Sequence, residues 1–180
     1  MALTIVMPDA TLPLDLESKA AAASRMSEEE FRAFYDRTAR PVWAYLVRIT
    51  SDPPLADDLL QEAYYRFYRA GTVYENESHR RNSLFRIATN LARDSGRRKR
   101  RGIDVEIPEE LHAVSSHPDE RTDLTRALAR LKPMQREILW LAYGQGSSHA
   151  EIAEIIGVSS KSIKSLLFRA RRKLAELLRG

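Results

Sequence analysis

Apolar residues recur every three to four positions along most of the chain, and this spacing predicts helices rather than strands. A first helix is expected to begin after Ser27, because Glu30 follows three residues later and completes a capping box. The apolar pattern continues beyond Pro41, which is expected to open a second helix because proline suits the first turn. The N-terminal part is therefore predicted to be helical.

A third helix is expected to start at Asp52, whose side chain can cap it, with Pro53 in its first turn. Gly71 is expected to end this helix near residue 70, since glycine adopts the left-handed conformation that helix ends require. A loop is predicted from Gly71 to about Arg80. A fourth helix should follow, with Leu84 among its apolar positions and a strongly basic tail.

The pattern breaks between residues 102 and 121, where acidic residues and two prolines predict a linker. Helical spacing resumes at Leu124, and helices are expected from Pro133, from about Ser148 to Ile156 and from Ser159 to Leu178. The predicted fold is all-α, with two small helical domains joined by a flexible acidic linker. We expect an N-terminal extension over 1–26, domains over 27–101 and 122–180, and the linker over 102–121.

Composition excludes several classes of protein. The chain has 180 residues, a net charge of +4 and no cysteine, which removes disulfide scaffolds, thiolate metal sites and cysteine nucleophiles and fits a cytoplasmic protein. The apolar runs are shorter than the roughly 18 residues that a membrane helix needs. The four histidines are scattered and the glycines form no phosphate-binding loop. We therefore expect no catalytic residue, no metal and no cofactor.

Residues 151–170 have the pattern of a helix-turn-helix, the C-terminal element of the predicted fold. Ala153, Gly157 and Ile163 fall at the positions that need a small residue, a turn and an inward apolar side chain. The second helix would face DNA with short and cationic residues that suit base edges and phosphates. A plain helical hairpin with a solvated basic face is the alternative. The candidate DNA contacts are Ser159, Ser160, Lys161, Ser162, Lys164, Ser165, Arg169 and Arg172.

A second basic patch extends the fourth predicted helix over residues 93–101. Arg86, Asn90 and Arg93 are three to four residues apart and so share one helix face, as a helix that follows DNA phosphates requires. A solvated tail is the alternative. The candidate DNA contacts in this region are Asn82, Arg86, Asn90, Arg93, Arg97, Arg98 and Arg100.

The third predicted helix carries an opposite charge. Its exposed side should present an acidic stripe, which consists of Asp57, Asp58, Gln61 and Glu62. The helix dipole explains an acid near the N-terminus such as Asp57, but not one as far along as Glu62. Because the stripe would repel DNA, it indicates a protein partner.

Aromatic residues gather after this stripe. Phe67 is expected in the core. Tyr64 and Tyr68, one helical turn apart, suit either packing or a platform on which unpaired bases stack.

Two blocks of sequence resemble one known family. Residues 57–63, residues 84–94 and the arginine run after them resemble region 2 of extracytoplasmic-function (ECF) sigma factors. Residues 131–137, 151–154 and 169–174 resemble region 4 of the same family. The resemblance extends over about residues 28–178, with a linker where the family has one.

The resemblance implies an alternative sigma factor, which binds core RNA polymerase and promoter DNA and commonly has an anti-sigma factor. It implies that the acidic stripe docks on polymerase and that the loop over 71–82 captures an unpaired base of the −10 element. The helix from Leu84 would lie along adjoining DNA, and the helix over 159–172 would read the −35 element. Ser83 and Leu166 depart from the family pattern, which has tryptophan and arginine there. A free-standing helix-turn-helix regulator is the alternative, and a sigma-like decoy is a third.

Overall fold

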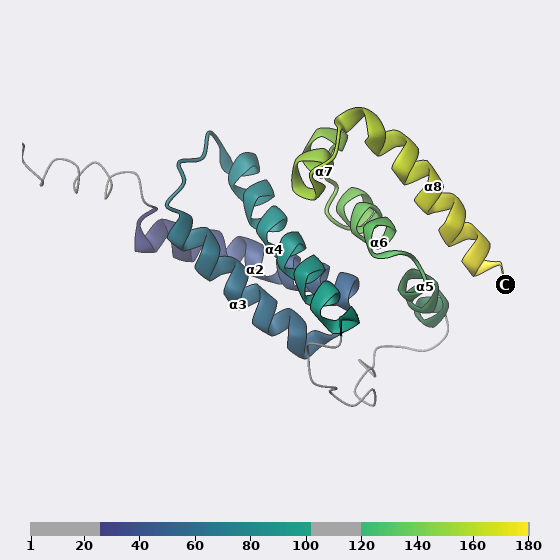
Figure 1. Ribbon diagram of the computed structural model, residues 1–180. Helices are drawn as coiled ribbons and strands as arrows, with labels where there is room; N and C mark the ends of the chain where they lie inside the picture. The colour runs from purple at the N-terminus through teal and green to yellow at the C-terminus, as the bar shows by residue number, and fades with distance from the viewer. Residues whose placement is uncertain (1–25, 102–119, 180) are drawn as a thin grey trace, which may run out of the picture.

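The computed structural model describes residues 26–101 and 120–179, and the regular structure of these ranges is helical (Figure 1). The N-terminal part contains α2 (Glu28–Thr50), α3 (Pro53–Ala70) and α4 (Glu77–Arg100). The C-terminal part contains α5 (Glu120–Ala129), α6 (Pro133–Leu139), the π-helical turn η2 (Trp140–Gly144), α7 (His149–Ile156) and α8 (Ser160–Leu178). The prediction of an all-α chain is confirmed. The extension over 1–25 and most of the expected linker, 102–119, lie outside the described residues.

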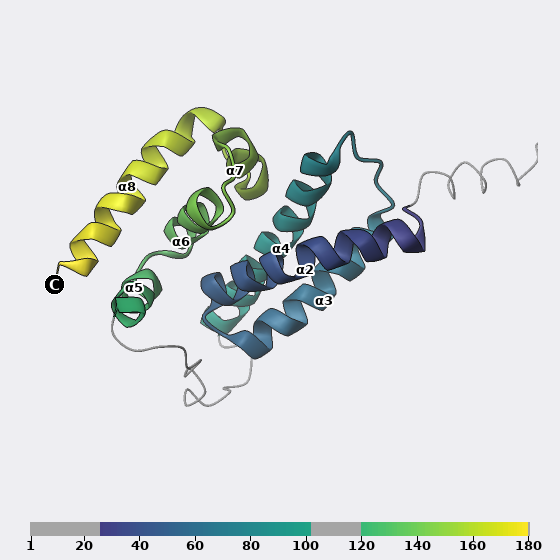
Figure 2. The same cartoon turned by 180° about the vertical axis from the view of Figure 1, so that it is seen from behind.

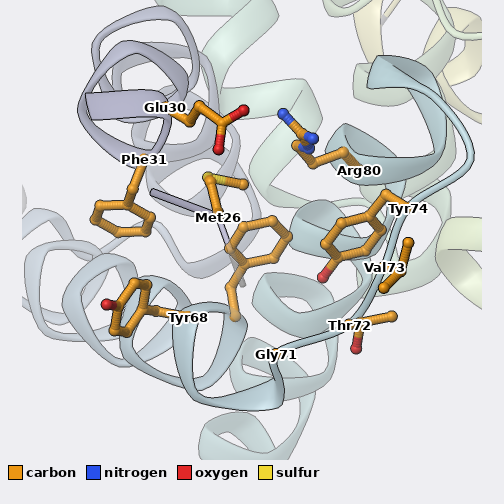
Figure 3. Close-up of a pocket in the computed structure, with 10 residues that line it drawn as sticks. Met26, Glu30, Phe31, Tyr68, Gly71, Thr72, Val73, Tyr74 and Arg80 are labelled. Carbon is orange, nitrogen blue, oxygen red and sulfur yellow. The ribbon is translucent and has the colours of Figure 1, made fainter. Parts of the chain in front are cut away.

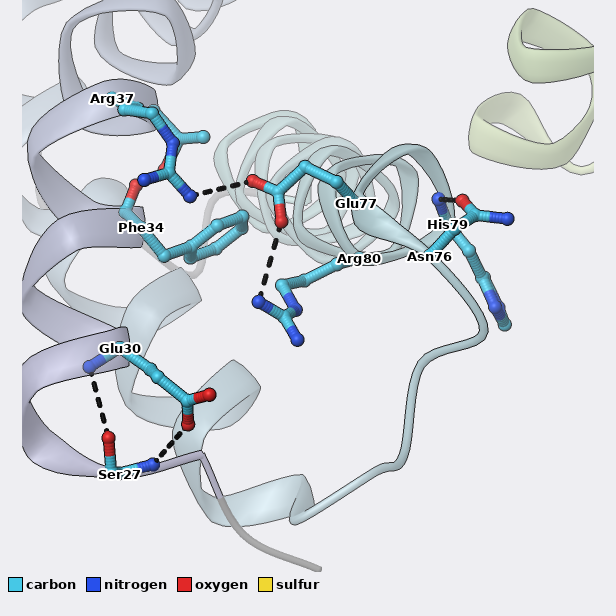
Figure 4. A network of polar contacts seen from close by, with 9 residues as sticks. Ser27, Glu30, Phe34, Arg37, Asn76, Glu77, His79 and Arg80 are labelled. Carbon is cyan, nitrogen blue, oxygen red and sulfur yellow. Dashed lines mark hydrogen bonds and ion pairs between the residues drawn. The ribbon is translucent and has the colours of Figure 1, made fainter.

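Helix α2 is continuous, so the prediction that Pro41 opens a new helix is wrong. Proline inside a helix removes one hydrogen bond and costs about 3 kcal/mol. The helix continues despite this cost because Phe34 before Pro41 and Tyr45 after it are both fully buried, so tertiary packing stabilises α2 on both sides of the proline. The expected start is confirmed, since Ser27 and Glu30 form a reciprocal capping box (Figure 4).

The start of α3 is as predicted, because Asp52 accepts a hydrogen bond from the Leu55 amide at 3.0 Å. Its end is also as predicted, with Gly71 in the left-handed region at φ 56°. The next helix, α4, begins earlier than expected. Asn76 caps it by accepting from the His79 amide at 2.8 Å, so the loop ends near residue 76 rather than 80.

The core of the N-terminal part lies between α2, α3 and α4 and contains stacked aromatic rings. Phe34 and Phe67 stack with their centroids 5.1 Å apart, so Phe67 is in the core as predicted. Tyr64 is buried as a packing residue, and its hydroxyl lies 2.6 Å from that of Thr38. Burial raises the pKa of Tyr64 to about 12, which keeps this hydroxyl neutral at physiological pH.

The C-terminal part contains the predicted helix-turn-helix, formed by α7 and α8. A capping box between Ser148 and Glu151 opens α7, and Gly157 closes it at φ +73°, a conformation that strains other residues. Ile163 is fully buried on the inner side of α8. The short π-helical turn before α7 was not predicted from the sequence.

The two parts lie against each other. Helix α4 is placed between the α2–α3 pair and the C-terminal helices, as the two opposite views show (Figures 1 and 2). It packs against α7, while α2 packs against α6. Both parts contribute to one continuous cluster of buried apolar residues.

Candidate nucleic-acid and protein interfaces

The acidic stripe lies on the solvent side of α3. Asp57, Asp58 and Gln61 are exposed, whereas Leu59 and Ala63 on the opposite side are buried. The Trp43 indole donates a hydrogen bond to Asp57 Oδ1 at 2.7 Å. This bond fixes the first carboxylate against α2 and leaves Asp58 toward solvent.

The last member of the stripe, Glu62, pairs with Arg66 at 2.6 Å, and its side chain is 41% exposed. Sequence reasoning missed Trp43 and Arg66 as neighbours of the stripe. The spacing of Glu62 and Arg66, one helical turn apart, could have indicated the second contact.

A pocket opens beside the loop between α3 and α4 (Figure 3). Its volume is about 190 Å³, below the roughly 300 Å³ at which sites for drug-sized ligands begin. Tyr74 stacks on Phe67 with the ring centroids 5.2 Å apart, and Tyr68 meets Phe31 edge-on at 5.1 Å. Tyr68 remains 51% exposed. The pocket thus offers aromatic surfaces to one small planar group.

Arg80 lies at the pocket as well and is held by Glu77 (Figure 4). The Glu77 carboxylate forms ion pairs with Arg37 at 3.0 Å and with Arg80 at 3.4 Å. The pair with Arg37 links α2 to the first turn of α4. The guanidinium of Arg80 lies over the Phe34 ring, 5.9 Å from its centroid. Its buried Nε has no hydrogen-bond partner among the described residues.

Most candidate DNA contacts on α4 lie on its open surface. This exposed group consists of Arg86, Asn90, Arg97, Arg98 and Arg100. Arg97 pairs with Asp94, and this hydrogen bond holds the pKa of Asp94 below its usual range. Ser83, where the family pattern has tryptophan, is buried.

Two candidates on α4 face the C-terminal part instead. Asn82 is buried, and its amide donates to Glu154 Oε2 at 2.9 Å. The Arg93 guanidinium contacts both carboxylate oxygens of Glu137, the shortest distance being 2.6 Å. Burial acts to lower the pKa of Arg93, but the hydrogen bonds and charge of Glu137 outweigh it and the pKa is raised.

Sequence reasoning did not identify Glu137 as a partner of Arg93. Glu137 is only 2% exposed and precedes the buried residues Ile138 and Leu139. A charge at a buried helix position needs a partner of opposite charge. The position of Glu137 next to this apolar run is the sequence signal that could have indicated a buried, paired carboxylate.

All candidate DNA contacts on α8, including its N-cap Ser159, are exposed. Ile163, Leu167 and Ala170 form the buried side of α8, and Leu166 packs at its edge, where the family pattern has arginine. Arg172 lies 3.6 Å from Glu176, an exposed pair that water screens. The exposed group is Ser159, Ser160, Lys161, Ser162, Lys164, Ser165, Arg169 and Arg172.

Comparisons with known proteins give matches to both parts of the chain. Residues 34–102 match Sigma-70 region 2, and residues 121–174 match Sigma-70, region 4. The chain is 32% identical to the ECF RNA polymerase sigma factor SigL of Mycobacterium tuberculosis over 151 residues, an alignment that covers 79% of this chain and 85% of SigL. It is 33% identical to SigM of Bacillus subtilis, covering 79% of this chain and 91% of SigM.

Solved structures share the fold. The sigma factor RpoE of Bartonella quintana, in complex with the anti-sigma factor NepR, superposes with a TM-score of 0.69 at 26% identity and covers 84% of this chain and 98% of RpoE. CnrH, in complex with the cytosolic domain of CnrY, gives a TM-score of 0.63 at 22% identity and covers 91% of this chain and 95% of CnrH.

The chain belongs to the ECF family of RNA polymerase sigma factors. It is an alternative sigma factor that directs transcription initiation, and that prediction is confirmed. Within the described ranges, no helix is long and apolar enough to cross a membrane.

Proposed function

We propose that the acidic stripe of α3 docks on core RNA polymerase, while α4 and α8 bind the two promoter elements. The observation that carries the proposal is the separation of charge over three helices. An exposed acidic surface lies on α3, and exposed basic surfaces lie on α4 and α8. A protein that must hold both an enzyme and DNA needs such separate surfaces, because the carboxylates would repel phosphates.

Docking would use Asp57, Asp58, Gln61 and Glu62. The Trp43 bond at 2.7 Å holds the Asp57 carboxylate in one orientation, which lowers the entropy lost when a partner binds. Exposed carboxylates on a rigid helix suit a basic surface and speed its association. Their exposure supports this role.

At the −10 element, the pocket beside the loop would hold one unpaired base. Extruding a base costs a few kcal/mol, and stacking on an aromatic ring offsets about 1–3 kcal/mol of this cost. Tyr68 and Tyr74 would supply the rings, and Arg80 lines the same pocket. The exposed basic residues of α4 would then hold the adjoining phosphates.

At the −35 element, α8 would enter the major groove of duplex DNA. The short side chains of Ser160 and Ser165 allow close approach, and Lys161 and Lys164 can reach base edges. Arg169 and Arg172 lie further along the helix, within reach of flanking phosphates.

The chain would carry no catalysis of its own, since core polymerase makes the RNA. We propose a cytoplasmic location, because core polymerase and chromosomal DNA, the partners of this role, are in the cytoplasm. An anti-sigma factor is a further proposed partner, because the RpoE and CnrH structures are described with NepR and CnrY.

The test of the docking surface is retention of purified core polymerase by the immobilised chain. Asp58→Lys with Glu62→Lys should reduce retention at least tenfold, and Asp36→Lys, which reverses an exposed charge on α2, should not. Binding to duplex DNA should persist in all variants. Undiminished retention by the double variant would refute the docking role and favour a regulator that acts without polymerase.

A further inference from the structure

Met26, the first residue that the structure describes, lies at the pocket beside the loop between α3 and α4 (Figure 3). Its side chain lines this pocket together with Phe31 and packs against the apolar core. The chain thus enters the folded N-terminal part at the pocket. The residues that precede Met26 are therefore tethered beside it.

The wall of the pocket presents apolar surface to solvent. Val73 is 69% exposed and Tyr68 is 51% exposed, and both line the pocket. The stacked ring of Tyr74 forms another side of it. Exposed apolar surface next to a small concave site is typical of a binding site, and aliphatic side chains suit this one as well as a base does.

The charges close to the pocket favour an acidic ligand. Burial raises the pKa of Tyr74, while the charges of Arg80 and Arg86 oppose this rise, so both guanidinium groups act on the Tyr74 hydroxyl. The lining contains one carboxylate, Glu30, which accepts a hydrogen bond from the Ser27 amide at 2.8 Å. An apolar segment that carries carboxylates would therefore complement the pocket.

The tethered residues include a segment of this chemistry, residues 12–17. Its three leucines occupy alternate positions, and Asp15 and Glu17 each follow a leucine. Such alternation would place the leucines on one side of an extended segment. Pro13 favours this form, because it fixes its own φ and disfavours the helical conformation of the residue before it. Over residues 1–18 the sequence has three acidic side chains and no basic one.

The tether is long enough for this segment to return to the pocket. Leu16 precedes Met26 by ten positions, and an extended chain advances at most about 3.3–3.6 Å per residue. The entropy of closing a loop grows only slowly with its length. A short tether also gives the segment an effective concentration on the order of millimolar, so that even a weak contact is populated.

We infer that residues 12–17 bind in the pocket as an internal competitor of the unpaired base, with the leucines against the aromatic rings and the two carboxylates toward the guanidinium groups of α4. The inhibitory part of this inference rests on the proposed base-binding role of the pocket. The recognition surface of α8 is separate from the pocket and stays exposed. Duplex DNA can therefore bind α8 while the pocket is occupied.

Docking of the segment can be measured by paramagnetic relaxation in the full chain. Because the sequence has no cysteine, Ala10→Cys accepts a single spin label next to the segment. The label should broaden the amide resonances of residues 72–74 in the pocket loop. The amides of α8 are the reference, since α8 lies on the opposite side of the molecule from the start of α2 (Figures 1 and 2).

The release variant replaces the three leucines of the segment by serine and keeps both of its carboxylates. The matched control replaces three apolar residues that have no acidic neighbour in sequence. The release variant consists of Leu12→Ser, Leu14→Ser and Leu16→Ser, and the control consists of Leu3→Ser, Ile5→Ser and Val6→Ser.

We expect the broadening of residues 72–74 to disappear in the release variant and to persist in the control. The affinity for a random-sequence single-stranded oligonucleotide should rise about tenfold in the release variant, as expected when the docked form holds about nine-tenths of the molecules. It should stay at the wild-type value in the control. Helical circular dichroism should be the same in all three chains.

The outcomes distinguish this inference from the proposed function. Equal broadening in wild type and the release variant would overturn the docking, whatever the DNA affinity. Broadening of an isotope-labelled chain by a separate spin-labelled chain would show that a second copy is the occupant, and it would overturn the internal contact. Loss of broadening without a gain in single-stranded DNA binding would overturn the inhibitory role. A complete absence of single-stranded DNA binding by every chain, with docking observed, would instead contradict the proposed function of the pocket.

Discussion

Gly157 forms the turn between α7 and α8, and its replacement by alanine isolates a single physical effect. The residue has φ +73° and ψ 43°, in the left-handed region. A Cβ added there would meet nothing within 4 Å. The cost of Gly157→Ala is therefore local backbone strain, without a clash against any residue beyond its two chain neighbours.

The magnitude follows from two opposing terms. The left-handed conformation costs a residue with a Cβ about 1–2 kcal/mol. Alanine also restricts the unfolded chain, which returns about 0.4–1 kcal/mol. The free energy of unfolding should fall by about 1 kcal/mol, and the melting temperature by about 2–4 °C for a chain of this size.

The assay is urea unfolding followed by far-ultraviolet circular dichroism, with Gly96→Ala as the opposite control. Gly96 lies within α4, and an added Cβ there also meets nothing within 4 Å. Without a positive φ, this substitution should stabilise the chain by about 1 kcal/mol. Gly157→Asn should lie between wild type and Gly157→Ala, because asparagine tolerates the left-handed region. A Gly157→Ala chain as stable as wild type would refute the reasoning.

Three further predictions concern the capping box, the pocket and the recognition helix. Hydrogen bonding from the Ser148 backbone lowers the pKa of Glu151 below its usual value of 4.5. The ionised carboxylate therefore stabilises the folded chain above pH 4.5, and this stabilisation is lost as the pH falls through the lower pKa of the folded state. Glu151→Ala should thus cost about 1 kcal/mol in urea unfolding at pH 7 and progressively less as the pH is lowered below 4.5, and a cost that does not change with pH would contradict this reasoning. Tyr68→Ala should weaken single-stranded DNA binding by about 1–3 kcal/mol. Tyr65 is similarly exposed but lies outside the pocket, so Tyr65→Ala should leave the binding unchanged. Equal losses in the two variants would show that the pocket does not hold a base. Arg169→Ala should reduce the slope of log affinity against log salt for duplex DNA by about 0.9, and an unaltered slope would show that Arg169 meets no phosphate.

The local signals in the sequence predicted helix ends well. Ser27, Asp52, Gly71 and Gly157 each end or begin a helix as expected. Capping depends on a few consecutive residues and on backbone conformation, so it can be derived from a short stretch of sequence.

Features that depend on distant residues could not be derived in this way. Pro41 lies inside one helix because buried side chains on both sides outweigh its local cost. The partners of Arg93 and Asn82 are 44 and 72 residues further along the chain. Helical periodicity placed these two side chains on the basic helix, but it contains no information on which surface would cover them. The resemblance to sigma factors likewise implies open DNA contacts, not a contact with the C-terminal part.

The most direct test of the central claim is transcription in vitro with purified core polymerase, the full chain and genomic DNA of the host, followed by sequencing of RNA 5′ ends. The account predicts new 5′ ends that depend on the chain and share a two-part sequence motif upstream. These ends should disappear with Asp58→Lys and Glu62→Lys together. The same 5′ ends with and without the chain would contradict its assignment as a promoter-specific initiation factor.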